Sequence, residues 1–385
     1  EIKKEKLKTI SFLFCTIILM ACSGKNIQEI QIDGAGNAVY KDVVNSSEIQ
    51  IRYIPEQYSL QKDLLTVEAS VNVPENLNLD AVPTGKAEIK LLNVDKITED
   101  LAAGIDVKEV MEEEEDGNED MDSFINQMIY FQDGSSLNIN PTYLSFVTPL
   151  TYYIDHAFWE EEGVDFYNAN VYKNRELSFA KPDEAYAEIK NRLEQWGIEI
   201  GEQYEYFGLN HRILEQEEYP IGDEGIYDAS LKKEVWNEED DCYYFYCGQE
   251  LQRIPIYYYG YGMLRGNHNI GSAIKVKYGK KGFVEVVINR PYIIQDTGES
   301  VYAISPEEAV DCLVQKFDNI ILTDPVVIDE ISLQMLPQRV AQGIYELTPV
   351  WIFEGDVYMT FDDGTQDSVR DKYMFDAVTG KEIIL

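Results

Sequence analysis

The chain has 385 residues, of which 70 are acidic and 32 basic, and its formal net charge is −38. A surface this acidic repels nucleic acid and anionic lipid, so neither is expected as a partner of the folded surface. We attribute the acidity to solubility rather than to cation binding. Apolar residues make up 45% of the chain, which is enough for two or three domains with cores of their own.

The first 21 residues have the parts of an export signal. Four lysines lie within residues 3–8, and the stretch 9–21 is almost entirely apolar. That stretch is shorter than the about 20 residues that a membrane-spanning helix needs. It closes with Leu19-Met20-Ala21-Cys22, which resembles the lipobox of bacterial prolipoproteins. The resemblance implies cleavage before Cys22, a diacylglycerol thioether on its sulfur, and often a further acyl chain, such as palmitate, on its new amino group.

This N-terminus predicts a lipoprotein signal peptide over 1–21 and a lipid anchor on Cys22. Two or three chains, at about 0.8 kcal/mol per buried CH₂, anchor a protein stably. We therefore expect a lipid-anchored protein on the extracytoplasmic face of the cell membrane. The alternative is an ordinary signal peptide, or an uncleaved anchor, that happens to contain a cysteine.

The segment after the signal is expected to be a tether over 22–47, followed by an N-terminal α+β domain over 48–175. Apolar residues alternate with polar ones from Leu65 to Val73, which predicts a strand. Residues 87–91 form a second strand and lead into a helix from about Asp95. Asp133-Gly134 marks the turn of a hairpin. The acidic run 112–120 is interpreted as a solvated loop because of its charge. Its glycine and its last position do not fit a calcium loop.

Two proline-initiated helices recur at a spacing of 124 residues. One begins with Lys181-Pro182-Asp183-Glu184-Ala185 and the other with Ser305-Pro306-Glu307-Glu308-Ala309. Proline and acids suit the first helical turn, and the second start also has the residues of a capping box. Both helices then carry an apolar stripe at offsets of 0, 4, 8 and 11 residues. The predicted stripes are Ala185, Ile189, Leu193, Trp196 and Ala309, Leu313, Phe317, Ile320.

Each of these helices is followed by antiparallel strands, so the sequence predicts an α+β fold of tandem modules. In each module one helix packs on one antiparallel sheet. The predicted repeats cover 176–300 and 301–385. A hairpin is expected at 274–287, turned by Gly279-Lys280-Lys281-Gly282. Chance similarity of two amphipathic helices is the alternative to duplication.

The last 80 residues resemble extracytoplasmic modules of the PepSY and two-component-regulator (YycI-like) type. The matching residues are the helix from Pro306, the segment Leu347-Thr348-Pro349-Val350-Trp351, and the segment 376–382. The resemblance implies a cystatin-like fold that inhibits, assists folding or regulates sensors, without catalysis. Trp351 is expected beneath the helix, and Gly380 in the final turn. The whole chain also resembles Firmicutes lipoproteins to which no function is assigned.

Three cysteines remain after export: Cys242, Cys247 and Cys312. The four residues between the first two favour a continuous strand, in which an odd step of five places side chains on opposite faces. Their Cα atoms then lie about 16 Å apart, beyond the about 7 Å limit for a disulfide. We therefore predict that these two thiols are not bonded to each other and that Cys312 is a packed thiol.

No pattern in the chain indicates a catalytic or metal site. His156, His211 and His268 stand without a second ligand at metal-binding spacing, and no serine stands in a GxSxG motif. The glycines of 260–266 are one residue too far apart for a dinucleotide loop. We expect no enzyme, no cofactor and no metal. A hydrolase with unrecognised paired carboxylates remains an alternative.

A tyrosine-rich stretch is the candidate ligand site. Tyr244, Tyr246, Tyr257 and Tyr259 lie on predicted strands, where an aromatic strip could stack on sugars. Tyrosine also suits any half-buried sheet, which is the alternative interpretation. The leading hypothesis is a non-catalytic lipoprotein that binds or regulates another envelope protein. The second hypothesis is a lipoprotein that binds a glycan or a cell-wall fragment on this tyrosine-rich face.

Overall fold

The computed structural model describes residues 53–116, 122–159, 168–222, 225–258, 274–320, 322–361 and 365–384, and two short strands nearer the N-terminus. The chain divides into two units, residues 1–50 and residues 51–385. The described part of the first unit is an antiparallel hairpin of β1 (Gln28–Ile32) and β2 (Ala38–Asp42). The hairpin lies within the expected tether, whereas the signal peptide and Cys22 lie outside the described residues.

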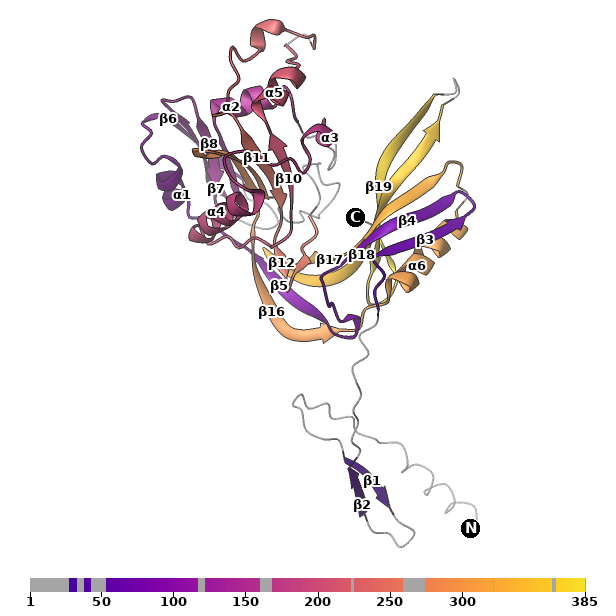
Figure 1. Cartoon of the computed structure of the whole chain (residues 1–385). Coiled ribbons are helices and arrows are strands. Elements are labelled where there is room, and N and C mark those ends of the chain that lie inside the picture. Colours follow the sequence, from indigo (N-terminus) through magenta and orange to yellow (C-terminus); the bar gives the residue numbers. More distant parts are fainter. Residues whose placement is uncertain are drawn as a thin grey trace, which may run out of the picture. The chain divides into compact units, whose positions relative to one another are not determined.

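The second unit contains two eight-stranded sheets, which we name after the helix that packs on each (Figure 1). The α4 sheet is antiparallel throughout and has the order β10-β11-β14-β15-β9-β8-β7-β6. Its strands are β6 (Val107–Glu115), β7 (Phe124–Phe131), β8 (Ser136–Asn140), β9 (Tyr143–Val147), β10 (Tyr204–Leu209), β11 (Cys242–Cys247), β14 (Ile274–Gly279) and β15 (Gly282–Asn289).

The α6 sheet joins strands from the two ends of the second unit. Its order is β16-β5-β18-β17-β4-β3, with β19 on β18 and β20 on β19. The pairing of β17 with β4 is parallel, and β18 pairs with both β5 and β19 along different parts of its length. The strands are β3 (Gln57–Lys62), β4 (Leu65–Asn72), β5 (Val82–Ile89), β16 (Tyr292–Val301), β17 (Val326–Ala341), β18 (Ile344–Thr360), β19 (Gln366–Asp376) and β20 (Glu382–Ile383).

The remaining elements connect these strands or cover the sheets. A small hairpin, β12 with β13, lies between β11 and β14 in the chain. Their bounds are β12 (Glu250–Leu251), β13 (Ile254–Pro255), α1 (Val94–Leu101), α2 (Pro149–Ile154), α3 (Ala169–Tyr172), α4 (Pro182–Gln195), α5 (His211–Glu217), α6 (Pro306–Asp318), and the 3₁₀ turns η1 (Leu79–Ala81) and η2 (Ala229–Leu231).

The predicted fold class is wrong: the protein is mostly β, with large sheets, and is not a tandem of one-helix modules. The strands after each helix do form the expected antiparallel series, β10-β11-β14-β15 in one sheet and β17-β18-β19 in the other. Other strands, distant in sequence, complete each sheet. The pairings therefore cross the expected boundaries at 175 and 300, since β9 pairs with β15 and β5 pairs with β18. The periodicity of a sequence indicates which face of a strand is buried, but it does not indicate which distant strand pairs with it.

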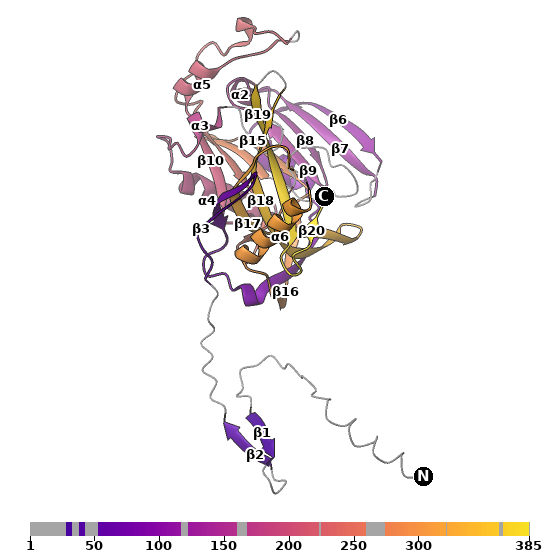
Figure 2. The same cartoon turned by 90° about the vertical axis from the view of Figure 1, so that its right-hand side faces the viewer.

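Both predicted helices begin at the predicted prolines, Pro182 and Pro306. Ser305 accepts a hydrogen bond from the Glu308 amide, and Glu308 accepts one from the Ser305 amide, so the capping box is confirmed. The predicted stripes are buried in the core of each sheet except at Ile320, which lies two residues beyond the end of α6 and is 49% exposed. Figure 2 shows α6 lying across the strands of its sheet.

Trp351 occupies the predicted place beneath α6. Its side chain is fully buried in the same core as the helix stripe, and its Nε1 donates to the Ile304 carbonyl over 3.1 Å. Gly380 has a φ of 70° and closes the last turn with a 2.8 Å hydrogen bond from its amide to the Asp376 carbonyl. Glycine accepts this left-handed backbone without the strain that a side chain would add.

Gln249 links the two sheets. Its buried amide group donates to the carbonyls of Glu199, after α4, and of Tyr292, the first residue of β16, and accepts from the Tyr292 amide at 2.6 Å. The neighbouring β12–β13 hairpin extends the link, because Leu251 and Ile254 lie in the core of the α6 sheet.

Candidate functional site

The predicted tyrosine-rich face is not a surface. Tyr244, Tyr246 and Tyr257 are only 4%, 7% and 3% exposed, and Tyr259 lies outside the described residues. The rings of Tyr244 and Phe158 lie 5.6 Å apart, and those of Tyr246 and Tyr258 lie 5.5 Å apart, all as core contacts. Sugars cannot stack on these rings as they are packed here. These three tyrosines are therefore core residues of the protein rather than an exposed strip.

The physical reason is that β11 is covered on both faces. Tyr243, Phe245 and Cys247 belong to the core beneath α4, whereas Cys242, Tyr244 and Tyr246 belong to the core on the opposite face. That second core also contains residues of α2, α3 and α5. A strand buried on both faces has a continuous apolar sequence rather than an alternating one.

Successive side chains of a strand point to opposite faces, and this geometry also separates the two thiols of β11. Cys242 and Cys247 are free and lie in different cores, as predicted. Burial raises the pKa of each thiol to about 12, so both stay protonated and are poor nucleophiles. Cys312 is also free and packs against the core beneath α6.

A charged cluster lies on the α2 face of the α4 sheet. Lys277 Nζ lies 2.6 Å from both Asp155 Oδ1 and Glu285 Oε2, and its side chain is 6% exposed. Burial alone would lower the pKa of Lys277, but the charges of Glu285 and Asp155 outweigh burial and raise it above its usual value. A lysine held protonated in this way ties Asp155, just after α2, to the sheet and is unsuited to act as a base or nucleophile.

His211 and Asp241 form a second polar contact on the same sheet. Asp241 Oδ1 lies 2.7 Å from His211 Nδ1 and accepts the His211 backbone amide at 2.6 Å. Asn210, which precedes α5, caps the helix by accepting the Arg212 amide. Asp241 therefore fastens the start of α5 to the end of the loop before β11, which is a structural role.

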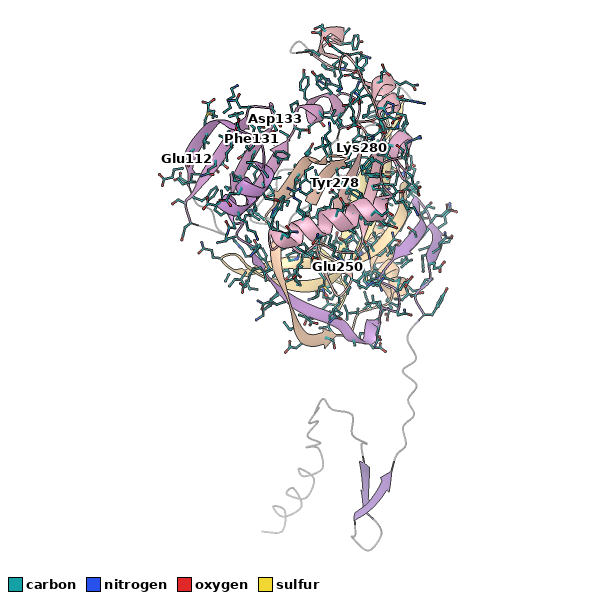
Figure 3. The ribbon with its side chains drawn as sticks, turned by 60° about the vertical axis from the view of Figure 1, so that its left-hand side comes forward. Glu112, Phe131, Asp133, Glu250, Tyr278 and Lys280 are labelled. Atoms are coloured by element: carbon teal, nitrogen blue, oxygen red, sulfur yellow. The ribbon has the colours of Figure 1, made fainter. Side chains whose placement is uncertain are left out.

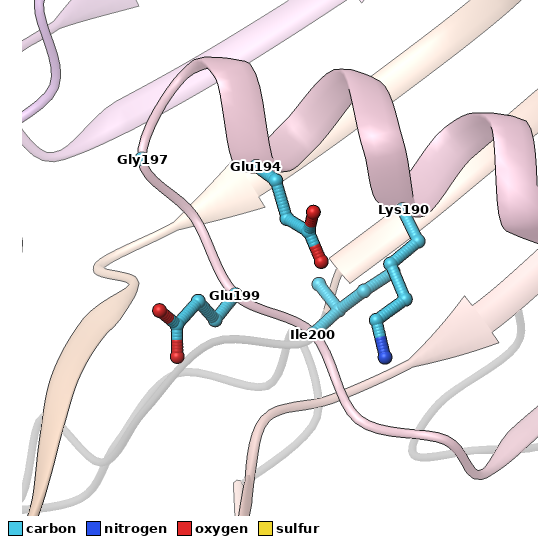
Figure 4. A pocket seen from close by; sticks show the side chains of 5 residues that line it. All are labelled: Lys190, Glu194, Gly197, Glu199 and Ile200. Atoms are coloured by element: carbon cyan, nitrogen blue, oxygen red, sulfur yellow. The ribbon is translucent and has the colours of Figure 1, made fainter.

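A hollow of about 450 Å³ lies beside the C-terminal end of α4 (Figure 4). Its lining residues are Lys190, Glu194, Gly197, Glu199 and Ile200. Lys190 is already paired with Glu202, and the carboxylates of Glu194 and Glu199 are exposed to water. The hollow therefore has no buried polar group directed at a ligand, and its geometry does not define one.

An exposed apolar surface lies instead on the segment 219–235, which we call the arm and describe without residues 223 and 224. Glu218 closes the base of the arm, because its buried carboxylate accepts the Lys233 amide at 2.8 Å and the Trp236 indole at 3.1 Å. Figure 1 shows the arm extending beyond α5. The arm is thus a defined projection fastened to the α4 sheet.

The arm carries large apolar side chains into solvent. Their exposed fractions range from 41 to 65%, and they belong to Tyr219, Ile221, Ile226, Tyr227 and Val235. The rings of Tyr219 and Tyr227 lie 4.8 Å apart, and Ile221 forms a bridge to Tyr227. Contiguous exposed apolar residues of this kind mark interaction surfaces. No periodic pattern in the sequence indicates the arm, although its turn residues Pro220, Gly222 and Gly225 stand between apolar ones.

The described residues contain no group of three His, Cys, Asp or Glu side chains placed to hold a metal ion. Within that same part of the chain, no helix is long and apolar enough to cross a membrane.

Comparison with known proteins supports the fold and goes no further. No protein-family model matches the sequence, and no curated protein matches it. A solved structure of an uncharacterised protein from Eubacterium rectale is similar, with a TM-score of 0.64 at 15% identity. The similarity covers 86% of this chain and 94% of that one. The resemblance to PepSY modules stays a prediction.

Proposed function

We propose that the protein is a membrane-anchored extracytoplasmic lipoprotein that binds another envelope protein and does not catalyse a reaction. The observation that carries the proposal is the arm, whose exposed apolar side chains are held on a fixed base. Burying an apolar side chain against a partner contributes about 1.5–3 kcal/mol, and four or five such residues make an effective binding surface. A lipid on Cys22 would keep this surface close to other envelope proteins.

The resemblance of the C-terminal segment to PepSY and YycI-like modules supports the same role, because those modules bind and regulate other proteins. The alternative of a glycan-binding lipoprotein loses most of its support, since Tyr244, Tyr246 and Tyr257 are buried and Tyr259 lies outside the described residues.

Site-specific cross-linking in the native membrane tests the proposal. A photoreactive residue replaces Ile226 in the arm or, as a control, Val340 at the end of β17, which is 54% exposed. We expect a discrete adduct with one protein from position 226 and none from position 340. Equal adducts from both positions, or none from either, would contradict a binding role for the arm.

Lipid labelling of the same cells tests the anchor on Cys22. An alkyne-labelled palmitate is expected to label the chain and to leave a Cys22→Ala variant unlabelled. Unchanged labelling of this variant would show that Cys22 is not the lipidated residue.

A further inference from the structure

The strand β6 is an open edge of the α4 sheet. It pairs with β7 along its length and ends the strand order, and no other described strand pairs with it. About half of the backbone N–H and C=O groups of such a strand point away from the sheet. At about 3.3 Å per residue, its nine residues present an edge of roughly 30 Å.

The opposite edge of the same sheet is covered. There, β10 is bridged by Lys173, which pairs with Phe207, and the Asn174 amide donates to the Tyr206 carbonyl over 3.2 Å. The segment after α3 therefore occupies the outer edge of β10 around Tyr206 and Phe207. The two edges of one sheet thus differ: the chain protects β10 with its own backbone and leaves β6 uncovered by any described residue.

The side chains of β6 are also accessible, on both faces. Eight of its nine residues are exposed. Val110 is 50% exposed and Met111 is 45% exposed, and as neighbours along a strand they point to opposite faces. Ile125, which pairs with Glu114, adds a further exposed apolar side chain on β7. An added strand could therefore bury apolar surface on both faces as well as form main-chain hydrogen bonds.

The charge of β6 selects the strand that can be added. It carries five glutamates, Glu109 and Glu112–Glu115, and one lysine, Lys108. Pairing two copies of β6 about its acidic half would place like charges opposite each other, which is destabilising. A strand with Lys or Arg at these positions would form opposite-charge pairs instead, and the net charge of −38 would attract it from a distance. Figure 3 shows Glu112 at the outer rim of the sheet.

We infer that β6 is a docking edge that accepts an extended, basic segment of another protein as a ninth strand of the α4 sheet. This site is separate in the chain from the arm, and it stands whether or not the arm binds a partner. The backbone of β6 supplies the hydrogen bonds, Val110 and Met111 supply apolar contacts, and the glutamates supply selectivity.

A designed peptide tests the inference on the lipid-free chain 22–385. The probe is a fluorescent decapeptide of alternating lysine and threonine, and its matched control is methylated on alternate backbone nitrogens. Binding is measured by anisotropy and by hydrogen exchange of the amides of 107–115. We expect the unmodified peptide to bind and to slow exchange in β6. The methylated peptide is expected to bind at least about tenfold more weakly, because it cannot donate along one edge.

Two charge variants separate strand addition from general attraction. The double variant Glu113→Lys/Glu114→Lys is expected to weaken binding at least about tenfold, because it places like charges opposite the peptide. The double variant Glu68→Lys/Glu75→Lys makes the same change of net charge at exposed residues on and just after β4, in the α6 sheet, and is expected to change binding less than about threefold.

Three results would overturn the inference. The first is equal binding of the methylated peptide, and the second is equal weakening in both variants. The third is a dimer of the chain alone that protects β6 from exchange, because the occupant would then be a second copy.

Discussion

The α4 and α6 sheets begin from the same local pattern and are completed in different ways. In each, a proline-initiated helix packs one apolar stripe on antiparallel strands that follow it in the chain. The opposite face of the α4 sheet is covered by short helices and holds the charged Lys277 cluster. The opposite face of the α6 sheet holds a smaller apolar cluster of five buried residues. A shared local pattern therefore does not fix the surroundings of a sheet, which depend on the strands and helices that pack from elsewhere.

The last position of the helix stripe gives the largest expected difference between the two sheets. Trp196 is 4% exposed and its Nε1 donates to Asp100 Oδ2 over 3.0 Å, whereas Ile320 is 49% exposed. Trp196→Ala is expected to lower the free energy of unfolding by about 3–5 kcal/mol, and Ile320→Ala by less than about 0.5 kcal/mol. Urea unfolding of the lipid-free chain measures both. Similar losses in the free energy of unfolding would show that Ile320 contributes to its core as much as Trp196 does.

The second comparison concerns one lysine from each sheet. Lys277→Ala leaves Glu285, whose side chain is 13% exposed, without its counter-charge and is expected to cost about 3 kcal/mol. Lys62, on β3 of the α6 sheet, pairs with Asp318, and their side chains are 40% and 49% exposed, so Lys62→Ala is expected to cost about 1 kcal/mol or less. Unfolding in urea at neutral pH gives both values. A loss at Lys277 no greater than at Lys62 would mean that the cluster is screened by water.

The helix starts give the smallest expected effect. Ser305 caps α6 with its hydroxyl, whereas Lys181 precedes α4 and has no acceptor to offer, so only Glu184 makes its half of the contact. Ser305→Ala is expected to cost about 1 kcal/mol, and Lys181→Ser to gain up to about 1 kcal/mol. Thermal unfolding measured by circular dichroism detects the opposite signs. A loss of stability in both variants would contradict the inference that only α6 has a complete N-terminal cap.

Local features could be predicted from the sequence because they depend on neighbouring residues. The strand from Leu65, the turn at Gly134, the two helix starts and the turn at Gly380 all follow from side-chain period, proline or glycine. The pairing of Ala87 with Ile294 could not be predicted in this way. Such pairing depends on which strands meet in the folded chain, and periodicity carries no information about that.

The candidate surfaces were predicted less well than the fold elements. The run Cys242–Cys247 is apolar throughout, which is the pattern of a strand buried on both faces, so its burial could have been predicted. The run of acidic residues 112–115 favours a solvated loop, because blocks of like charge usually lie in solvated segments, and yet these residues lie on β6. Pairing with β7 holds them in a strand whose side chains still reach water. The arm follows no period, and only the folded structure shows its apolar residues together.

The parallel pairing of β4 with β17 cannot form until late in the synthesis of each chain. Leu65 is opposite Val326, so the first strand is made long before its partner exists. At about 5–20 residues per second, a ribosome needs tens of seconds to cover that distance. Throughout this time the apolar face of β4, which includes Leu65 and Val67, has no sheet to cover it. The α4 sheet carries no such delay across its own residues, because its strands all lie between the two halves of the α6 sheet. A chain that stops between Asn289, the last residue of β15, and Val326 is left with a complete set of α4 strands and an adhesive N-terminal end.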